Sequence, residues 1–162
     1  MTLYDNLLRE VPIPVNDDAD IPGPRKGLYI DMSMNSRRVK AILLDPKKIR
    51  TRTEKRCVLA EELGHHYTTY GDIEDQTILT NRKLERRARI WAHEKLVPLT
   101  SIVDAHKAGI RNRHEFADYL QVTEEFLDEA LRRYQEKYGL CKQIDKYTIV
   151  FEPLGVAQFF DF

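Results

Sequence analysis

The sequence is poor in cysteine: Cys57 and Cys141 are the only two in 162 residues, and they form no Cys-x-x-Cys pair. Two distant thiols are typical of buried apolar side chains in a reducing compartment, and they do not make a disulfide framework. If the chain binds a metal ion, we therefore expect histidine and carboxylate side chains to hold it.

Long apolar runs are also missing, since no stretch approaches the roughly 18 residues that a membrane span requires. The N-terminal residues MTLYDNLLRE lack the basic segment and apolar run of a secretory signal, so a cytoplasmic location is expected. Net charge is zero, because 26 Lys and Arg balance 26 Asp and Glu, and no overall field favours nucleic acid or membrane. Basic side chains nevertheless dominate residues 37–56, and acidic ones dominate residues 114–138.

The residue pattern predicts an α+β fold with one small sheet. Apolar, branched runs predict strands at residues 27–31 and 39–45. Helices are predicted at residues 1–10, 52–69, 82–97, 100–107, 113–120 and 123–138. The four prolines of VPIPVNDDADIPGP predict an irregular connection, and YTIVFEP with VAQFFDF predicts a strand or an extended tail. We expect residues 1–99 to form the core, with residues 100–162 packed on it as a helical segment that ends in a strand.

The stretch RCVLAEELGHHYTTY, residues 56–70, differs by one residue from a zinc-protease helix. Such a helix carries H-E-x-x-H, in which two histidines hold the metal and the glutamate is the general base. Here the frame reads Glu61-Glu62-Leu63-Gly64-His65, after a predicted capping box that Thr51 and Glu54 form. Residues four apart differ by only about 40° around a helix, so Glu61 and His65 project from one face as a ligand pair.

The opposite face of this helix is expected to anchor it in the core through Leu59, Leu63 and Tyr67. His66 falls on that anchoring side, which favours a core histidine or one that supports the site over a metal ligand. The alternative interpretation of Glu61 and Glu62 is an acidic patch in solvent that precedes two histidines by chance.

The next long helix contains ERRARIWAHEKLVP, residues 85–98. Its predicted buried stripe consists of Leu84, Ala88, Trp91, Ala92 and Leu96, and Glu85 falls inside that stripe. A carboxylate on a buried stripe is costly unless it is paired or bound to a cation. The small side chains of Ala88 and Ala92 would let the two helices approach closely, which would bring Glu85 toward Glu61 and His65. The alternative is a buried ion pair between Glu85 and an arginine such as Arg56.

AEELGH, followed twenty residues later by E-x-x-A-x-x-W-A-x-x-x-L-x-P, resembles the ImmA/IrrE family of metallo-endopeptidases. This likeness covers about residues 27–138, and it implies a zincin-like core within residues 1–99. By position in the family's motif, Glu62 matches the base, His65 the second histidine and Glu85 the third ligand. Glu61 stands where the family has its first histidine. The resemblance further implies a protein substrate, a repressor of the helix-turn-helix type encoded by a phage or mobile element.

A carboxylate at position 61 changes the charge of the predicted metal site more than its geometry. Zinc binds carboxylate oxygen and histidine nitrogen at similar distances, so Glu61, His65 and Glu85 would leave one position open for water. Two carboxylates cancel the charge of a dication, which weakens the polarisation of water. We therefore expect slow hydrolysis or use of Mn²⁺ in place of Zn²⁺. The substrate is expected to add a strand to the edge of the predicted sheet.

Two other functions stay open from the sequence. The chain could be a pseudopeptidase that binds protein without cleaving it, because Glu61 replaces a histidine. Residues 111–134 could also form a helix-turn-helix, but its second helix would open with four acidic residues that repel DNA phosphates, so no direct contact with nucleic acid is expected. His93 is predicted at the surface because it lies on the polar side of its helix. His106 and His114 are predicted at the surface because they have no acidic neighbours at ligand spacing, and Asp72 is a weak alternative third ligand.

Overall fold

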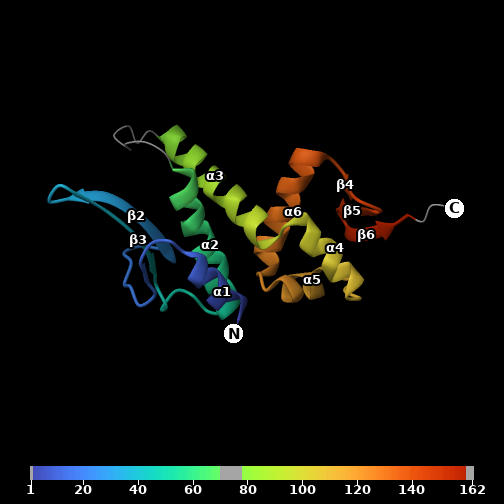
Figure 1. Cartoon of the computed structure of the whole chain (residues 1–162), viewed down its shortest axis with the longest axis horizontal. Coiled ribbons are helices and arrows are strands. Elements are labelled where there is room, and N and C mark those ends of the chain that lie inside the picture. Colours follow the sequence, from blue (N-terminus) through green and yellow to red (C-terminus); the bar gives the residue numbers. More distant parts are fainter. Residues whose placement is uncertain (1, 70–77, 160–162) are drawn as a thin grey trace. The chain divides into compact units, whose positions relative to one another are not determined.

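A computed structural model describes residues 2–69 and 78–159, and the side chains of all of these except residues 78–80. The chain divides into two compact units, residues 1–92 and 93–162, which are described separately. The first contains α1 (Leu3–Glu10), β1 (Val15–Asn16), β2 (Gly27–Met34), β3 (Arg37–Leu44), α2 (Arg52–Thr68) and most of α3 (Ile78–Leu96). The second contains α4 (Leu99–Lys107), α5 (Arg113–Leu120), α6 (Glu124–Tyr138), β4 (Cys141–Ile144), β5 (Tyr147–Phe151) and β6 (Leu154–Gln158) (Figure 1). The predicted α+β class is confirmed, while the predicted division at residue 99 stays a prediction.

The sheet of the first unit has the strand order β1-β3-β2, so β2 lies at an edge of it. Strands β2 and β3 form an antiparallel hairpin whose two turn residues, Asn35 and Ser36, have φ angles of 48° and 64°. Two residues with positive φ are typical of the tight turn that matches the twist of a hairpin. The short strand β1 pairs in parallel with β3, so the prediction that the proline-rich stretch has no regular structure is wrong at Val15 and Asn16.

Helix α2 begins where the sequence predicted. The Thr51 hydroxyl accepts a hydrogen bond from the backbone N–H of Glu54, which satisfies one of the free donors of the first turn. The Glu54 carboxylate accepts from the backbone N–H of Arg50, so only the Thr51 half of the predicted capping box forms. Helix α2 then packs against β2 and β3, and Leu59 and Leu63 are buried in the core.

The prediction that Tyr67 anchors α2 in the core is wrong, because this side chain is 40% exposed. Tyr67 instead stacks on Trp91 of α3, with 5.1 Å between the ring centroids. Leu59 and Leu63 are in the core, but the last turn of α2 lies outside it, so the Tyr67 ring packs on the neighbouring helix α3.

The second unit combines three helices with a second sheet, in the antiparallel order β4-β5-β6. Alternate residues of β5, namely Tyr147, Ile149 and Phe151, are buried, as expected for a strand with one covered face. The predicted C-terminal strand is confirmed by β5 and β6, whereas β4 and a second sheet were not predicted. None of the helices in the described part of the chain has both the length and the apolar composition of a membrane span.

Two histidines of the second unit differ from their predicted settings. His93 is only 5% exposed and packs edge-on against Phe126 of α6, 4.8 Å away, so its predicted surface position is wrong. The prediction rested on a single helix wheel, which could not include the apolar side of α6. His114 is exposed as predicted, but it does have acidic neighbours, since Nδ1 lies 2.7 Å from Oε1 of Glu124 and Nε2 lies 3.4 Å from Oδ2 of Asp118.

Candidate active site

The candidate site depends on a close approach of α2 to α3. A Cβ atom added to Gly64 would lie 2.3 Å from the carbonyl oxygen of Ala88, so the two backbones touch at this point. Ala88 and Ala92 are fully buried, as predicted for the small residues that allow such an approach. The contact places the turn of α2 that carries His65 beside the turn of α3 that carries Glu85.

His65 and Glu85 form a pair across these helices. Nε2 of His65 lies 3.4 Å from Oε2 of Glu85. Burial lowers the pKa of His65, but the hydrogen bond and charge of Glu85, with the charges of Glu62 and Glu61, raise it above its usual value overall. The same hydrogen bond holds the pKa of Glu85 below its usual range. Among the described residues, the ion-pair partner of Glu85 is therefore His65 and not an arginine such as Arg56, which the alternative interpretation proposed.

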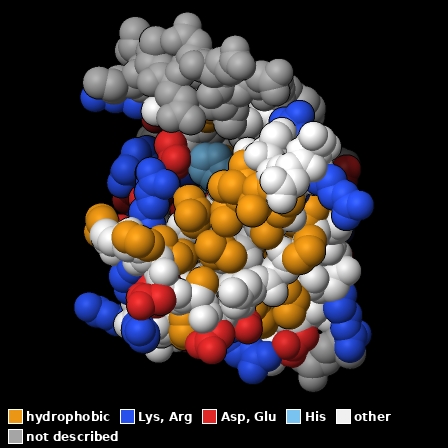
Figure 2. All heavy atoms as spheres, turned by 90° about the vertical axis from the view of Figure 1, so that its left-hand side faces the viewer, with side chains coloured by type: hydrophobic (Ala, Val, Ile, Leu, Met, Phe, Trp, Pro, Cys, Tyr) orange, Lys and Arg blue, Asp and Glu red, His pale blue; other side chains and the backbone are white. Residues whose placement is uncertain are grey.

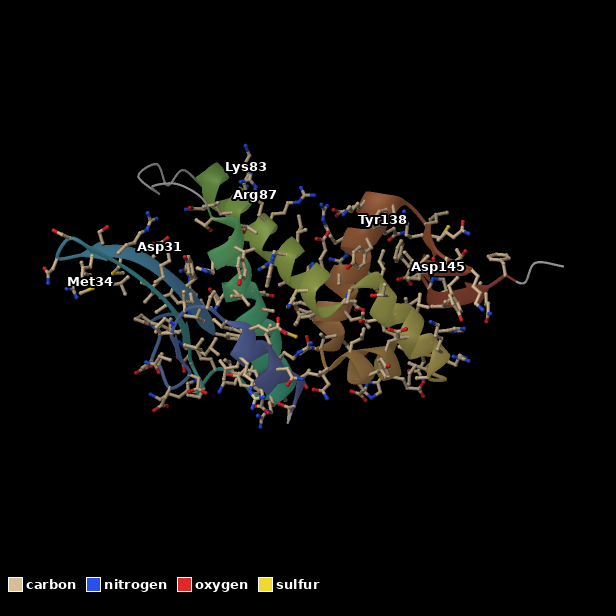
Figure 3. The ribbon with its side chains drawn as sticks, in the orientation of Figure 1. Asp31, Met34, Lys83, Arg87, Tyr138 and Asp145 are labelled. Atoms are coloured by element: carbon tan, nitrogen blue, oxygen red, sulfur yellow. The ribbon has the colours of Figure 1, made fainter. Side chains whose placement is uncertain are left out.

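The position of Glu85 on its helix corrects one prediction. Its side chain is 57% exposed, so Glu85 lies at the margin of the buried stripe and not inside it. Arg25 and Arg89 are close enough to favour its charged form. Lys83, two residues before Glu85 on α3, points to solvent (Figure 3). An exposed carboxylate beside a histidine is open to solvent and to a ligand.

Glu62 lies on α2 against the first residues of β2. Its carboxylate accepts a hydrogen bond from the backbone N–H of Tyr29. A Cβ atom on Gly27 would come within 2.7 Å of Oε1 of Glu62 and within 2.6 Å of Val58, so only glycine leaves this space open. Burial raises the pKa of Glu62 to about 7, and this outweighs the opposing effects of His65 and of the Tyr29 N–H. A carboxyl group with a pKa near neutrality suits proton transfer to and from water.

The contact with Tyr29 also shows how the edge of β2 is oriented. The backbone carbonyl of Lys26 accepts a hydrogen bond from the backbone N–H of Asp45, where the pairing of β2 with β3 begins. Backbone groups alternate in direction along a strand, so residues of even number in β2 point toward β3. Tyr29, Asp31 and Ser33 therefore direct their N–H and C=O groups to the side of β2 where no strand of the described residues pairs with it, which we call its open edge. Glu62 meets the first of these three residues.

A group of side chains beneath the hairpin joins β2 to the end of α2. The hydroxyl oxygen of Tyr29 lies 3.3 Å from Nδ1 of His66 and 3.4 Å from Oδ2 of Asp31. Asp31 also accepts hydrogen bonds from Arg38, the nearest at 2.7 Å. Burial, with the charge of Asp31, raises the pKa of Tyr29 to about 12. His66 thus supports the strand beside Glu62, in agreement with its predicted supporting place.

The residues present fit a zinc ion in part. Two ligands of one tetrahedral zinc lie about 3.3 Å apart when each bond is about 2.0–2.1 Å long, which is close to the separation found between His65 and Glu85. Glu61 lies one turn before His65, and its charge raises the pKa of that residue. Within residues 2–69 and 78–159, however, no three His, Cys, Asp or Glu side chains are grouped closely enough to hold a metal. The ligand set Glu61, His65 and Glu85 stays a prediction, and Asp72 lies outside the described residues.

Sequence reasoning missed three residues of this arrangement: Gly27, Tyr29 and Gly64. Gly64 is the residue before His65, and a glycine inside a helix is itself a signal of close packing. Gly27 likewise begins a predicted strand at a position where a side chain is excluded. Nothing in the sequence signals the hydrogen bond of Tyr29, because it depends on the distance between β2 and α2.

The chain matches one known protein family. Residues 28–132 match the family model described as the IrrE N-terminal-like domain, peptidase family M78. No curated protein and no solved structure matches the chain. The matched range covers more than half of the sequence and includes Glu62, His65 and Glu85. The chain therefore belongs to the IrrE N-terminal-like family of metallopeptidase-like proteins.

Proposed function

We propose that this protein is a metal-dependent endopeptidase in which Glu61, His65 and Glu85 hold a zinc ion and Glu62 is the general acid and base. The observation that carries the proposal is the position of Glu62, which is partly buried, hydrogen-bonded to the strand edge at Tyr29 and close enough to His65 and Glu85 for their charges to act on it. When bound, zinc would polarise the peptide carbonyl and make water more acidic, and Mn²⁺ could replace it on two carboxylates. Glu62 would accept a proton from the attacking water and donate it to the leaving amine.

The proposed substrate is a segment of a protein, extended along the open edge of β2. Backbone groups of Asp31 and Ser33 point away from β3 and can pair with an added strand. Such pairing would place the scissile bond near Tyr29, within reach of Glu62. By family likeness, the substrate is a helix-turn-helix repressor of a phage or mobile element. The reaction would take place in the cytoplasm.

The metal content of the purified full-length protein tests the proposal. Elemental mass spectrometry is expected to find close to one zinc or manganese ion per chain, and less in Glu61→Ala and Glu85→Ala. Glu94→Ala is the matched control, because Glu94 is a half-exposed glutamate of the same helix that pairs with Lys137. If the protein, after incubation with zinc and removal of the excess, retains no more metal than the two variants, the proposal is wrong.

A second candidate is a pseudopeptidase that binds its partner without cleavage. Glu61 favours it, because a carboxylate replaces the histidine of the family's motif and no three ligands are grouped within the described residues. The two functions differ in the effect of Glu62→Gln. In an enzyme, this substitution abolishes cleavage of the protein substrate while zinc stays bound. In a binding protein, it changes neither the metal content nor the affinity for the partner.

A further inference from the structure

The β2–β3 hairpin carries an apolar face that is open to solvent. Met32 is 48% exposed, Met34 is 55% exposed and Val39 is 39% exposed. Met32 lies opposite Val39 in the hairpin, and both side chains project from the same face as Met34. Exposed apolar residues are ordinary when they are scattered, but here they are neighbours on two paired strands. We refer to Met32, Met34 and Val39 as the hairpin apolar face.

The hairpin apolar face lies on the side of the sheet that is turned away from α2. The Tyr29 side chain points to the other side, where it meets His66 of α2. Side chains alternate along a strand, so those of Met32 and Met34 point to the side opposite Tyr29. Figure 3 shows Met34 near the end of the hairpin and Asp31 nearer to α2, while Figure 2, which faces the hairpin end, shows hydrophobic side chains gathered at the surface.

The same strand joins this face to the candidate site. Met32 and Met34 follow Tyr29 by three and five residues, or roughly 10 Å and 16 Å at about 3.3 Å per residue. A segment that pairs with the open edge at Tyr29 and continues along Asp31 and Ser33 must pass beside both methionines. Side chains of neighbouring strands that share a face lie about 4.5–5.5 Å apart and contact each other.

The charges at the end of the hairpin favour an acidic residue in this segment. Arg38 and Lys40 are paired with Asp31. Arg37, which lies opposite Met34, is exposed, and the described residues place no carboxylate within ion-pair distance of it. Arg37 lies one strand farther from the open edge than Met34, but it projects from the same face, so its long side chain can reach across Met34 toward the side chains of a segment that extends this far.

We infer that the hairpin apolar face binds an extended protein segment through apolar side chains at alternate positions of that segment. These positions lie three and five residues from the segment's residue opposite Tyr29, and an acidic residue of the segment lies near Arg37. The inference rests on the proposed function in so far as the bound segment is the substrate. The protein would then prefer particular substrate residues at positions away from the scissile bond.

Binding of peptides tests the inference without any cleavage. A displayed library of random twelve-residue peptides is selected on the full-length protein with Glu62→Gln, and selected peptides are synthesised and titrated by fluorescence anisotropy. We expect them to carry apolar residues at alternate positions and to bind about tenfold more weakly when Met32→Ser and Met34→Ser are added. Leu140→Ser is the matched control, because Leu140 is 74% exposed and lies in the second unit.

A second measurement keeps Met32 and Met34 and changes the peptide instead. Moving the apolar residues of a selected peptide by one position turns them to the other side of the added strand, so we expect an equal loss of affinity. Peptides that bind the methionine variant equally well, that tolerate the shift, or that cannot be selected at all would overturn the inference. So would a dimer of the protein that dissociates on the methionine substitutions, because the face would then bind a second copy.

The outcome is separate from that of the proposed function. If the peptides bind through the methionines but are not cut by the zinc-loaded protein, the inference holds and the enzyme proposal fails. If the protein cleaves its substrate with a sequence preference that does not change on substitution of Met32 and Met34, the enzyme proposal holds and the inference fails.

Discussion

Gly64 of α2 and Ala88 of α3 touch backbone to backbone, with only 2.3 Å between the carbonyl oxygen of Ala88 and the place where a Gly64 Cβ would be. No rotamer change can relieve such a contact, because the atom in the way belongs to the main chain. The approach brings His65 within 3.4 Å of Glu85. A glycine therefore controls the separation of two residues, the one that follows it directly on α2 and one on the next helix.

Gly64→Ala is expected to lower the free energy of unfolding by about 3 kcal/mol, since the added methyl group forces the helices apart. Helix propensity alone would act in the opposite direction, by about 1 kcal/mol. Urea denaturation followed by circular dichroism measures the change. Gly155→Ala is the control, because nothing lies within 4 Å of a Cβ at that position. Equal stability of the two variants would show that the helices are not in contact at Gly64.

Gly27→Ala is expected to slow cleavage more than it lowers stability. The added methyl group meets side-chain atoms of Val58 and Glu62, which can move aside, so we expect a stability loss of about 1 kcal/mol. Moving Glu62 by a few tenths of an ångström disturbs a proton transfer that requires exact hydrogen-bond geometry, and a rate loss of about tenfold or more follows. Cleavage of the protein substrate and urea denaturation, measured on the same preparation, separate the two effects. A loss of stability with full activity would contradict the proposed role of this contact.

Glu62→Gln is expected to reduce cleavage by about 10²–10⁴-fold, the usual contribution of a general acid or base. The amide keeps the size of the carboxylate and its acceptor for the Tyr29 N–H, so the fold is retained. Metal content should stay at the wild-type level, because Glu62 is not among the proposed ligands. Retention of full activity would exclude Glu62 as the base.

Asp45 is expected to contribute to the acid sensitivity of the first unit. Its carboxylate is completely buried and accepts hydrogen bonds from Lys48, at 2.8 Å, and from the backbone N–H groups of Ile21 and Lys47. Lys48 and the Ile21 N–H together hold its pKa below the usual range. A lowered pKa in the folded state gives stability that is present above the unfolded value, about 3.9, and is lost as the pH falls through the folded value.

Asp45→Asn should therefore lower stability at pH 7 and weaken the decline of stability between about pH 5 and pH 2. Thermal unfolding across that pH range measures both effects. Asp20→Asn is the matched control, since Asp20 is 81% exposed and pairs only loosely with Lys47, at 3.5 Å. An Asp45→Asn variant with the acid response of wild type would rule out this contribution.

Tyr134→Phe is expected to destabilise the second unit by about 1 kcal/mol. The Tyr134 hydroxyl is buried and donates a 2.7 Å hydrogen bond to the carbonyl of Val97, just after α3. Phenylalanine keeps the ring and leaves that carbonyl without this donor. Tyr119→Phe, at a position that is 43% exposed, should change stability by less than about 0.5 kcal/mol in the same denaturation experiment.

Local patterns predicted most of the secondary structure. Helices α2, α4, α5 and α6 begin and end within one residue of their predicted limits, because caps and turns such as Thr51 and Gly139 depend only on neighbouring residues. Strands β1 and β4 were missed, because each is short and is defined by its partner strand rather than by its own composition.

The order of residues in the two helices was enough to name Glu61, Glu62, His65 and Glu85, since helical spacing and the resemblance to a peptidase family can both be read from the sequence. Tertiary structure alone decided that Glu85 is half-exposed beside His65, that Tyr29 holds Glu62 at the strand edge, and that His93 is buried against Phe126. Helical periodicity fixes only the direction of a side chain around its own axis. What the side chain meets depends on how closely a second element approaches, and here a single glycine, Gly64, sets that distance for α2 and α3.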